Sequence, residues 1–218
     1  VLRHASRFGG DYGKATDSDG VGPDAPQPNR ELGLTKARAA TMFMLGLPGA
    51  SYLYQGEELG LPEHTTLAPE FRQDPTFART GGKRVGRDGC RVPLPWQDGV
   101  GEANGFNTNG KSWLPQPEIY REYSRDQQDG VAGSTLELYK SALRTRRELK
   151  LGEGSFAWLP QFTNERALGY RNGSILVIHN FGFDPLALPA GKVILRSVFA
   201  GDESHIAQNE TVWVQLAH

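Results

Sequence analysis

The most pronounced apolar pattern in the first half of the chain is LTKARAATMFMLGLPG, residues 34–49. Alanine and methionine keep the entropy cost of a helix low, Thr35 can cap its start, and Gly46 with Pro48 can stop it. We therefore expect a helix of about ten residues here. Because the run is apolar on most sides, this helix should be buried.

A short apolar and aromatic run, ASYLYQ, follows directly and ends at Gly56. Such a run is typical of a strand that is buried on both faces of a parallel sheet. A helix joined to such a strand by a few residues is half of a βαβ unit. This part of the chain is therefore expected to be α/β.

A second helix is predicted in STLELYKSALRTRREL, where Ser134 and Glu137 have the spacing of a capping box. Beyond it the pattern changes to short β-rich runs: FAWL, RALGYR, SILVIHNF, KVILRSVF and TVWVQL. The pair Asn172-Gly173 between two of them indicates a hairpin with a type I′ turn. We place a domain boundary near Leu151, with an α/β part over residues 1–150 and an antiparallel β part over 151–218.

Composition and charge narrow the function. The chain has 24 basic and 25 acidic side chains and a net charge of -1, so a general binder of nucleic acid or of an anionic membrane surface is not expected. No apolar run is long enough to span a bilayer. The single cysteine, Cys90, excludes an internal disulfide and is compatible with a reducing compartment, so a cytoplasmic location is expected. Glycine and proline concentrate in 9–29 and 81–133, and long loops of this kind favour a binding site.

Three passages share the order and spacing of known family motifs: VLRHASRFG (residues 1–9), GASYLYQGEELG (49–60) and RDGCRVPLPW (87–96). Together they resemble the C-terminal part of glycoside hydrolase family 13, the α-amylase superfamily. The resemblance is closest to its bacterial α-glucosidase and oligo-1,6-glucosidase group. Ser51 stands where the family pattern of the second passage has proline.

This resemblance implies an α/β fold: the C-terminal part of a (β/α)8 TIM barrel, from the end of strand 7 to helix 8, followed by a small antiparallel β-sandwich domain. It also implies a retaining α-glucosidase acting on short α-linked gluco-oligosaccharides of the maltose or isomaltose type. Retaining glycosidases use a carboxylate nucleophile and a carboxylic acid. In the family these groups and a third Asp precede the part matched here, so we assign no catalytic residue and expect all three upstream of Val1. The isolated chain is expected to be inactive.

The resemblance implies substrate-binding roles for Arg3, Arg87 and Asp88 at the face of the barrel that carries the active site. An arginine can donate to a sugar hydroxyl while it pairs with a carboxylate, and Arg87 is the foremost candidate. A structural ion pair is an equally weighted alternative for Arg3, and support of a neighbouring arginine is favoured for Asp88. For Trp96 and Trp113, stacking on a sugar is considered, but buried anchoring of the loop is favoured. Supporting roles are assigned to His4, Tyr54, Glu58, Arg91 and Trp96.

Neither a metal site nor a cofactor is predicted, because no cluster of Cys and His and no phosphate-binding loop can be recognised. The expected partner is an oligosaccharide or disaccharide, and the oligomeric state is left open. Two alternatives remain: a glucosyl transferase or isomerase on the same scaffold, forming trehalose or isomers of sucrose, and a non-catalytic relative like the heavy subunits of amino-acid transporters.

Overall fold

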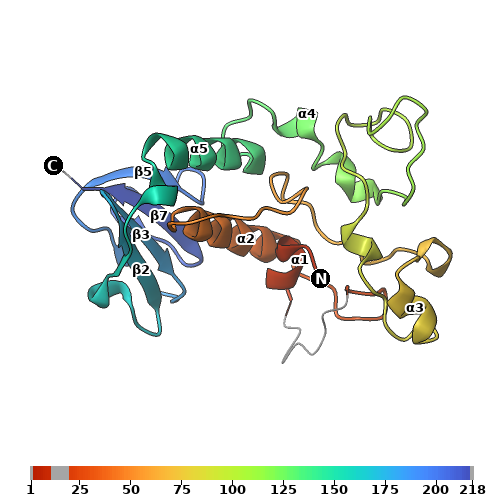
Figure 1. Cartoon of the computed structure of the whole chain (residues 1–218), viewed down its shortest axis with the longest axis horizontal. Helices are drawn as coiled ribbons and strands as arrows, with labels where there is room; N and C mark the ends of the chain where they lie inside the picture. The colour runs from red at the N-terminus through yellow and green to blue at the C-terminus, as the bar shows by residue number, and fades with distance from the viewer. Residues whose placement is uncertain (1, 11–19, 217–218) are drawn as a thin grey trace. The chain divides into compact units, whose positions relative to one another are not determined.

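The computed structural model describes residues 2–10 and 20–216 (Figure 1). The chain divides into two compact units, one formed by Val1–Leu34 with Tyr54–Val131 and the other by Thr35–Leu53 with Ala132–His218. Helix α2 begins in the first unit and ends in the second. The predicted boundary near Leu151, between a partial barrel and a β domain, stays a prediction.

The first unit consists of short helices joined by long loops. Its α-helices besides the start of α2 are α1 (His4–Phe8), α3 (Pro75–Arg79) and α4 (Arg125–Gln128). Its 3-10 helices are η1 (Pro69–Phe71), η2 (Asp88–Cys90) and η3 (Glu118–Arg121). Glycine and proline dominate the connections, as the composition of 81–133 predicted.

Helix α2 (Arg30–Leu45) has 16 residues, so it is longer than expected and Thr35 is not its cap. Asn29 fills that role, because its Oδ1 accepts a hydrogen bond from the backbone N–H of Leu32 at 3.0 Å. Gly33 lies inside the helix, where a Cβ atom would come within 2.0 Å of the carbonyl oxygen of Ala5. This glycine therefore allows α1 and α2 to approach closely. The predicted end before Gly46 is confirmed.

The predicted strand at ASYLYQ is wrong. The structure assigns no strand to residues 50–55, and Tyr52 is 89% exposed. A strand exists only where a neighbouring strand completes its hydrogen bonds, and within the described ranges no strand pairs with this segment. The apolar composition alone therefore did not produce a strand.

The second unit contains the end of α2, helix α5, two short 3-10 helices and all strands of the described residues. Helix α5 is Thr135–Glu148, η4 is Leu151–Glu153 and η5 is Pro160–Phe162. The strands are β1 (Ala157–Trp158), β2 (Ala167–Asn172), β3 (Ile175–Asn180), β4 (Leu186–Ala187), β5 (Lys192–Arg196), β6 (His205–Ile206) and β7 (Glu210–Gln215). The Oγ atom of Ser134 accepts from the N–H of Glu137 at 3.2 Å, which confirms the predicted cap of α5.

The strands form an antiparallel sheet in the order β1-β2-β3-β7-β5 and a small sheet of β4 and β6, which confirms the predicted antiparallel β region. Strand β3 is buried at every position because both of its faces are covered. One face of the large sheet packs on α2 and α5, and Figure 1 shows both helices beside it. The core on that face contains Met42, Leu45, Leu138, Ala142, Tyr170, Val177 and Trp213; the opposite face contributes Leu176, Ile178, Val212 and Val214, with Ile206 of β6.

The predicted hairpin joins β2 and β3, but its turn differs from the expected one. Asn172 pairs with Ile175, so the loop residues are Gly173 and Ser174. Among them only Gly173 has a positive φ, of 58°. A type I′ turn needs positive φ at both positions, whereas type II′ needs it at the first. The observed φ pattern fits type II′, and the buried Asn172 side chain donates to the carbonyl oxygens of Gly46 and Leu151.

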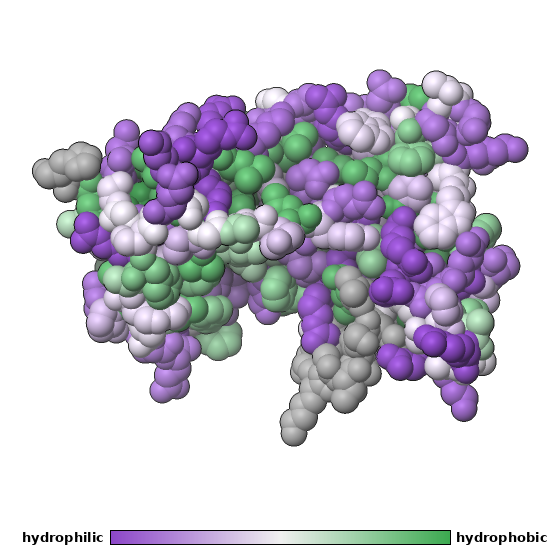
Figure 2. Space-filling view, in the orientation of Figure 1, coloured by the Kyte–Doolittle hydropathy of each residue, from purple (hydrophilic) through white to green (hydrophobic). Residues whose placement is uncertain are grey.

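Several aromatic side chains remain at the surface of the second unit. Phe183 is 88% and Trp158 52% exposed. Figure 2 shows hydrophobic residues on the surface in the region of β2 and β3. In the part of the chain that the structure describes, no helix combines the length and the apolar character needed to cross a bilayer.

Candidate functional site

Asp74 organises the loop that carries Arg87. It is the N-cap of α3, and its Oδ1 accepts from the N–H of Thr76 at 2.9 Å. Its Oδ2 accepts from the backbone N–H and the Nε of Arg87, at 3.2 and 2.9 Å, and from Nη2 of Arg91 at 3.3 Å. The hydrogen bond from the Arg87 side chain holds the pKa of Asp74 well below its usual range. Asp74 is therefore a buried anion that fixes two arginines.

Asp88 completes this network from the other end of the loop. It is fully buried, and its Oδ2 accepts from the N–H groups of Gln73 and Asp74, both at 2.8 Å. Its Oδ1 accepts from Nη2 of Arg91 at 2.6 Å. The side chain of Arg87 is 53% exposed. The two carboxylates thus hold the loop together while the Arg87 guanidinium stays accessible.

Arg3 lies in a second polar cluster and is only 1% exposed. Its Nη1 donates to the carbonyl oxygen of Gln55 at 2.7 Å, and its guanidinium carbon lies 5.5 Å from the centre of the Tyr54 ring. Its backbone N–H donates to Oε2 of Glu63 at 3.1 Å. Among the described residues, Nε and Nη2 of Arg3 have no hydrogen-bond partner. Buried donors of this kind are rare because each one costs free energy.

Glu63 faces Arg3 and was not among the predicted site residues. Its backbone N–H donates to Oγ of Ser6 at 2.7 Å. The carboxyl is almost fully buried, and burial raises its pKa to about 7. Its Oε1 has no partner within the described ranges. A Cβ atom on Gly20 or Gly89 would come within 2.8 or 2.7 Å of this oxygen, so only glycine leaves room for it.

The two clusters meet at residues 88–90. The hydroxyl of Tyr54 donates to the carbonyl oxygen of Cys90 at 3.1 Å, and the N–H of His64 donates to the carbonyl oxygen of Gly89 at 3.0 Å. Burial raises the pKa of Tyr54, so the hydroxyl keeps its proton at neutral pH. The structure therefore brings Arg3 and Tyr54 next to the loop that carries Arg87, Asp88 and Arg91.

His4 and Glu58 make local contacts at the edge of this region. Nδ1 of His4 lies 3.6 Å from Oε1 of Glu57. Burial lowers the pKa of His4 to about 4, so the pair is not an ion pair at neutral pH. Oε2 of Glu58 accepts from the N–H of Gly56 at 2.8 Å and stabilises a turn.

The favoured burial of Trp96 and Trp113 is wrong, because these residues are 45% and 53% exposed. Their loop is held by polar contacts instead. The N–H of Trp96 donates to the carbonyl oxygen of Asn104 at 2.8 Å, and Nδ2 of Asn104 donates to Oε1 of Gln116 at 2.7 Å. The guanidinium carbon of Arg91 lies 5.9 Å from the centre of the Trp113 ring, a cation–π distance.

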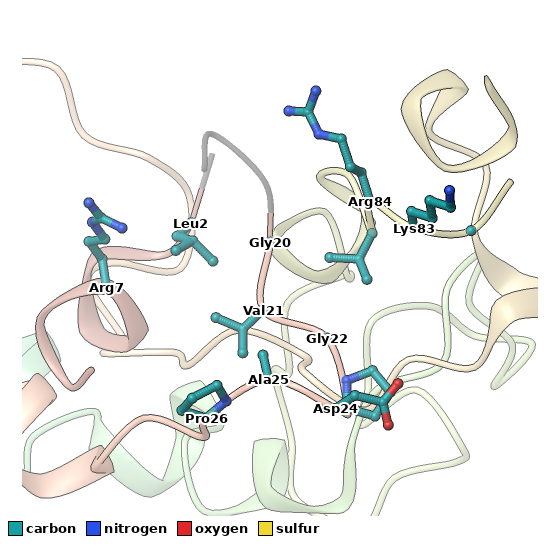
Figure 3. Close-up of a pocket in the computed structure, with 13 residues that line it drawn as sticks. Leu2, Arg7, Gly20, Val21, Gly22, Asp24, Ala25, Pro26, Lys83 and Arg84 are labelled. Carbon is teal, nitrogen blue, oxygen red and sulfur yellow. The ribbon is translucent and has the colours of Figure 1, made fainter. Parts of the chain in front are cut away.

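A pocket of about 640 Å³ adjoins these clusters in the first unit (Figure 3). It is lined by Leu2 and Arg7 and by the segments 20–26 and 82–85. None of the predicted site residues lines it. Within the described ranges, no group of three or more His, Cys, Asp or Glu side chains is placed to hold a metal ion.

Two residues that organise the site, Asp74 and Glu63, were missed from the sequence. Asp74 precedes proline, and Asp-Pro-Thr is a pattern of a helix start that was available in the sequence. Glu63 lies in GLPEHTTLAPE, a polar and proline-containing run that is typical of an exposed loop. Nothing in that pattern indicates a buried carboxyl.

Comparisons with known proteins all find enzymes of the alpha-amylase type among the proteins similar to this chain. Residues 26–154, more than half of the chain, match the model of the alpha amylase catalytic domain. Maltase 1 of Drosophila virilis is 32% identical over 137 residues, which are 61% of this chain and 21% of that protein. The salivary alpha-glucosidase of Aedes aegypti is 26% identical over 199 residues, 85% of this chain and 33% of that protein. The chain thus spans a third or less of the length of these relatives.

Solved structures and a further relative broaden this picture. The alpha-glucosyl transfer enzyme XgtA is 32% identical, with a TM-score of 0.70 over 99% of this chain and 38% of that one. Bacillus licheniformis trehalose-6-phosphate hydrolase shares the fold, with a TM-score of 0.70 and 23% identity over 100% of this chain and 41% of that one. The amino acid transporter heavy chain SLC3A1 of Mus musculus is 26% identical over 166 residues, 74% of this chain and 22% of that protein.

Proposed function

Because the chain belongs to the α-amylase family, as its motifs predicted, we propose that it is the C-terminal portion of a retaining α-glucosidase. The proposed substrates are short α-linked gluco-oligosaccharides of the maltose or isomaltose type. Maltase 1 and the salivary alpha-glucosidase, whose names describe glucosidases, support this choice. The cytoplasmic location and the absence of a cofactor stay predictions.

The observation that carries the proposal is the exposed guanidinium of Arg87, which is held by the buried carboxylate of Asp74. Asp74 holds the Arg87 Nε at 2.9 Å and leaves the side chain 53% exposed. A guanidinium keeps its charge and offers several N–H groups in one plane, so it can donate to sugar hydroxyls while it stays paired. Preorganisation of this kind lowers the entropy cost of binding.

Two other predicted residues, Asp88 and Arg3, are buried near the Arg87 loop. Asp88 is buried and saturated by hydrogen bonds, so we assign it to holding Arg91 and the loop. Arg3 is buried, but two of its nitrogens, Nε and Nη2, have no hydrogen-bond partner among the described residues. These groups are suited to a carboxylate or a hydroxyl at the floor of the glucosyl pocket. The reacting carboxylates are assigned to the part of the protein upstream of Val1.

The proposal is tested by kinetics of the full-length protein. Arg87→Ala should lower kcat/KM for maltose or isomaltose by at least about tenfold, because a charged hydrogen bond to the substrate is lost. Asp74→Asn should also lower it, because Arg87 loses its charged anchor. Arg79→Ala, which changes an exposed residue of α3, is the control and should leave it unchanged.

Unchanged kcat/KM for both disaccharides in Arg87→Ala would contradict the role of this loop in substrate binding. The isolated chain of 218 residues should not hydrolyse p-nitrophenyl α-glucoside. Turnover by the isolated chain would contradict the assignment of the catalytic carboxylates to the upstream part.

Two other functions have specific support. XgtA, described as an alpha-glucosyl transfer enzyme, favours a transferase, and isomer-forming chemistry that yields trehalose or isomers of sucrose belongs to the same alternative. Products formed from maltose by the full-length protein distinguish them: free glucose indicates hydrolysis, and new oligosaccharides or isomers indicate transfer. The relative SLC3A1 favours a non-catalytic protein, which would show no turnover of any α-glucoside.

A further inference from the structure

The pocket of about 640 Å³ has walls that are held in place by specific contacts. On one side, the N–H of Gly20 donates to the carbonyl oxygen of Gly86 at 2.8 Å, and Nε2 of Gln27 donates to that of Gly22 at 3.0 Å. On the other side, the N–H of Arg84 donates to Oγ1 of Thr80 at 3.1 Å. Both lining segments are therefore positioned by the fold.

The charge of the pocket differs from that of the chain. Among the described residues that line it, three are basic, Arg7, Lys83 and Arg84, and one is acidic, Asp24. The whole chain, by contrast, has a net charge of -1. Figure 3 shows Arg7 on one side of the pocket and Arg84 with Lys83 on the other. A concave surface lined by one sign of charge concentrates ligands of the opposite sign.

The remaining wall is suited to the body of a small sugar. Val21, Ala25 and Pro26 lie between the basic groups in Figure 3. Apolar side chains and exposed backbone can pack against the C–H faces of a pyranose. The basic groups can donate to an anion, and lysine and arginine both bind phosphate oxygens well.

We propose that this basic pocket, formed by Arg7, Lys83, Arg84 and their neighbours, binds the anionic group of a sugar phosphate. In this proposal the anionic group contacts Lys83 and Arg84, and the sugar ring packs against Val21 and Ala25. The choice of a sugar rests on the proposed function, because the pocket adjoins two of the proposed substrate-binding residues. Leu2 of the pocket precedes Arg3, and Gly20 is hydrogen-bonded to Gly86, which precedes Arg87. The choice of an anion rests on the lining alone.

Calorimetric titration of the full-length protein with glucose 6-phosphate, glucose and inorganic phosphate tests the proposal. Glucose 6-phosphate should bind more tightly than either of the other two, and more weakly at high salt because the attraction is screened. Lys83→Gln and Arg84→Gln should each weaken it about tenfold, the effect of one charged hydrogen bond. Both side chains are exposed, so these variants should fold. The matched control is Arg79→Gln, which removes an exposed charge outside the pocket and should change nothing.

Wild-type protein that fails to bind glucose 6-phosphate, or equal binding by a variant carrying both substitutions, overturns the proposal. Inorganic phosphate that binds as tightly as glucose 6-phosphate overturns the sugar part of it. Hydrolysis of p-nitrophenyl α-glucoside is measured on the same samples. Hydrolysis without binding of glucose 6-phosphate rejects the pocket and keeps the proposed glucosidase. Binding that is lost in the variants, without any hydrolysis, supports the pocket and rejects the glucosidase.

Discussion

Glu63→Gln isolates the effect of the buried carboxyl beside Arg3. Glutamine has nearly the same shape, and its side-chain oxygen can still accept the N–H of Arg3, which now lies 3.1 Å from Oε2. The substitution removes the ability to ionise and replaces one carboxyl oxygen by an NH2 group. Because burial raises the pKa of Glu63 to about 7, the folded protein should hold a neutral carboxyl there over much of the acidic range.

The direction of the pH effect follows from the two states. Below pH 4.5, the ordinary pKa of this group, the carboxyl is protonated in both the folded and the unfolded chain. Between pH 4.5 and about 7 the unfolded chain ionises while the folded chain keeps its proton, so stability is lost as the pH rises. Raising the pKa from 4.5 to about 7 corresponds to about 3 kcal/mol of unfolding free energy. The loss is complete above about pH 7.

The assay is denaturant unfolding of the full-length wild type and Glu63→Gln across this pH range. The free energy of unfolding of the wild type, relative to that of the variant, should fall by about 3 kcal/mol from below pH 4.5 to above pH 7. Glu70→Gln, an exposed glutamate of the same loop, is the control. It should follow the wild type at every pH.

Parallel stability curves for the wild type and Glu63→Gln would refute this reasoning. They would mean that Glu63 ionises in the folded protein as it does in the unfolded chain. A wild type that loses stability relative to the variant as the pH falls would also refute it, because that direction belongs to a carboxyl with a lowered pKa.

Two stability predictions concern the second unit and are measured by denaturant unfolding. In Gly46→Ala the new Cβ would come within 2.5 Å of the Tyr170 hydroxyl, so a loss of about 1–3 kcal/mol is expected. In Gly173→Ala, where φ is +58° but the space is open, the left-handed conformation alone should cost about 1–2 kcal/mol. No loss of stability in Gly46→Ala would contradict the clash with Tyr170. Ser134→Ala should cost about 1 kcal/mol through the lost cap of α5, whereas Ser141→Ala inside the helix should cost less; equal effects would show that the cap contributes nothing.

Much of the second unit could be predicted because short-range chemistry decides it. The Ser134 hydroxyl caps α5 three residues before Glu137, and this contact depends only on local spacing. The alternation of side chains in β2, β3 and β7 matches the two faces of the sheet. The hairpin was placed correctly, but its turn type depends on strand register, which pairs Asn172 with Ile175. The position of the turn was therefore local information and its geometry was not.

The sequence by itself determined the family, the two long helices and the antiparallel strands, because motif order, capping and side-chain alternation act over a few residues. Tertiary structure decided whether ASYLYQ became a strand, since its hydrogen bonds need a neighbour. It also decided that Asp74 binds Arg87, 13 residues away, and that Glu63 is buried against Arg3, 60 residues away. Burial and long-range pairing depend on which segments the fold brings together, and no local pattern around these residues records that.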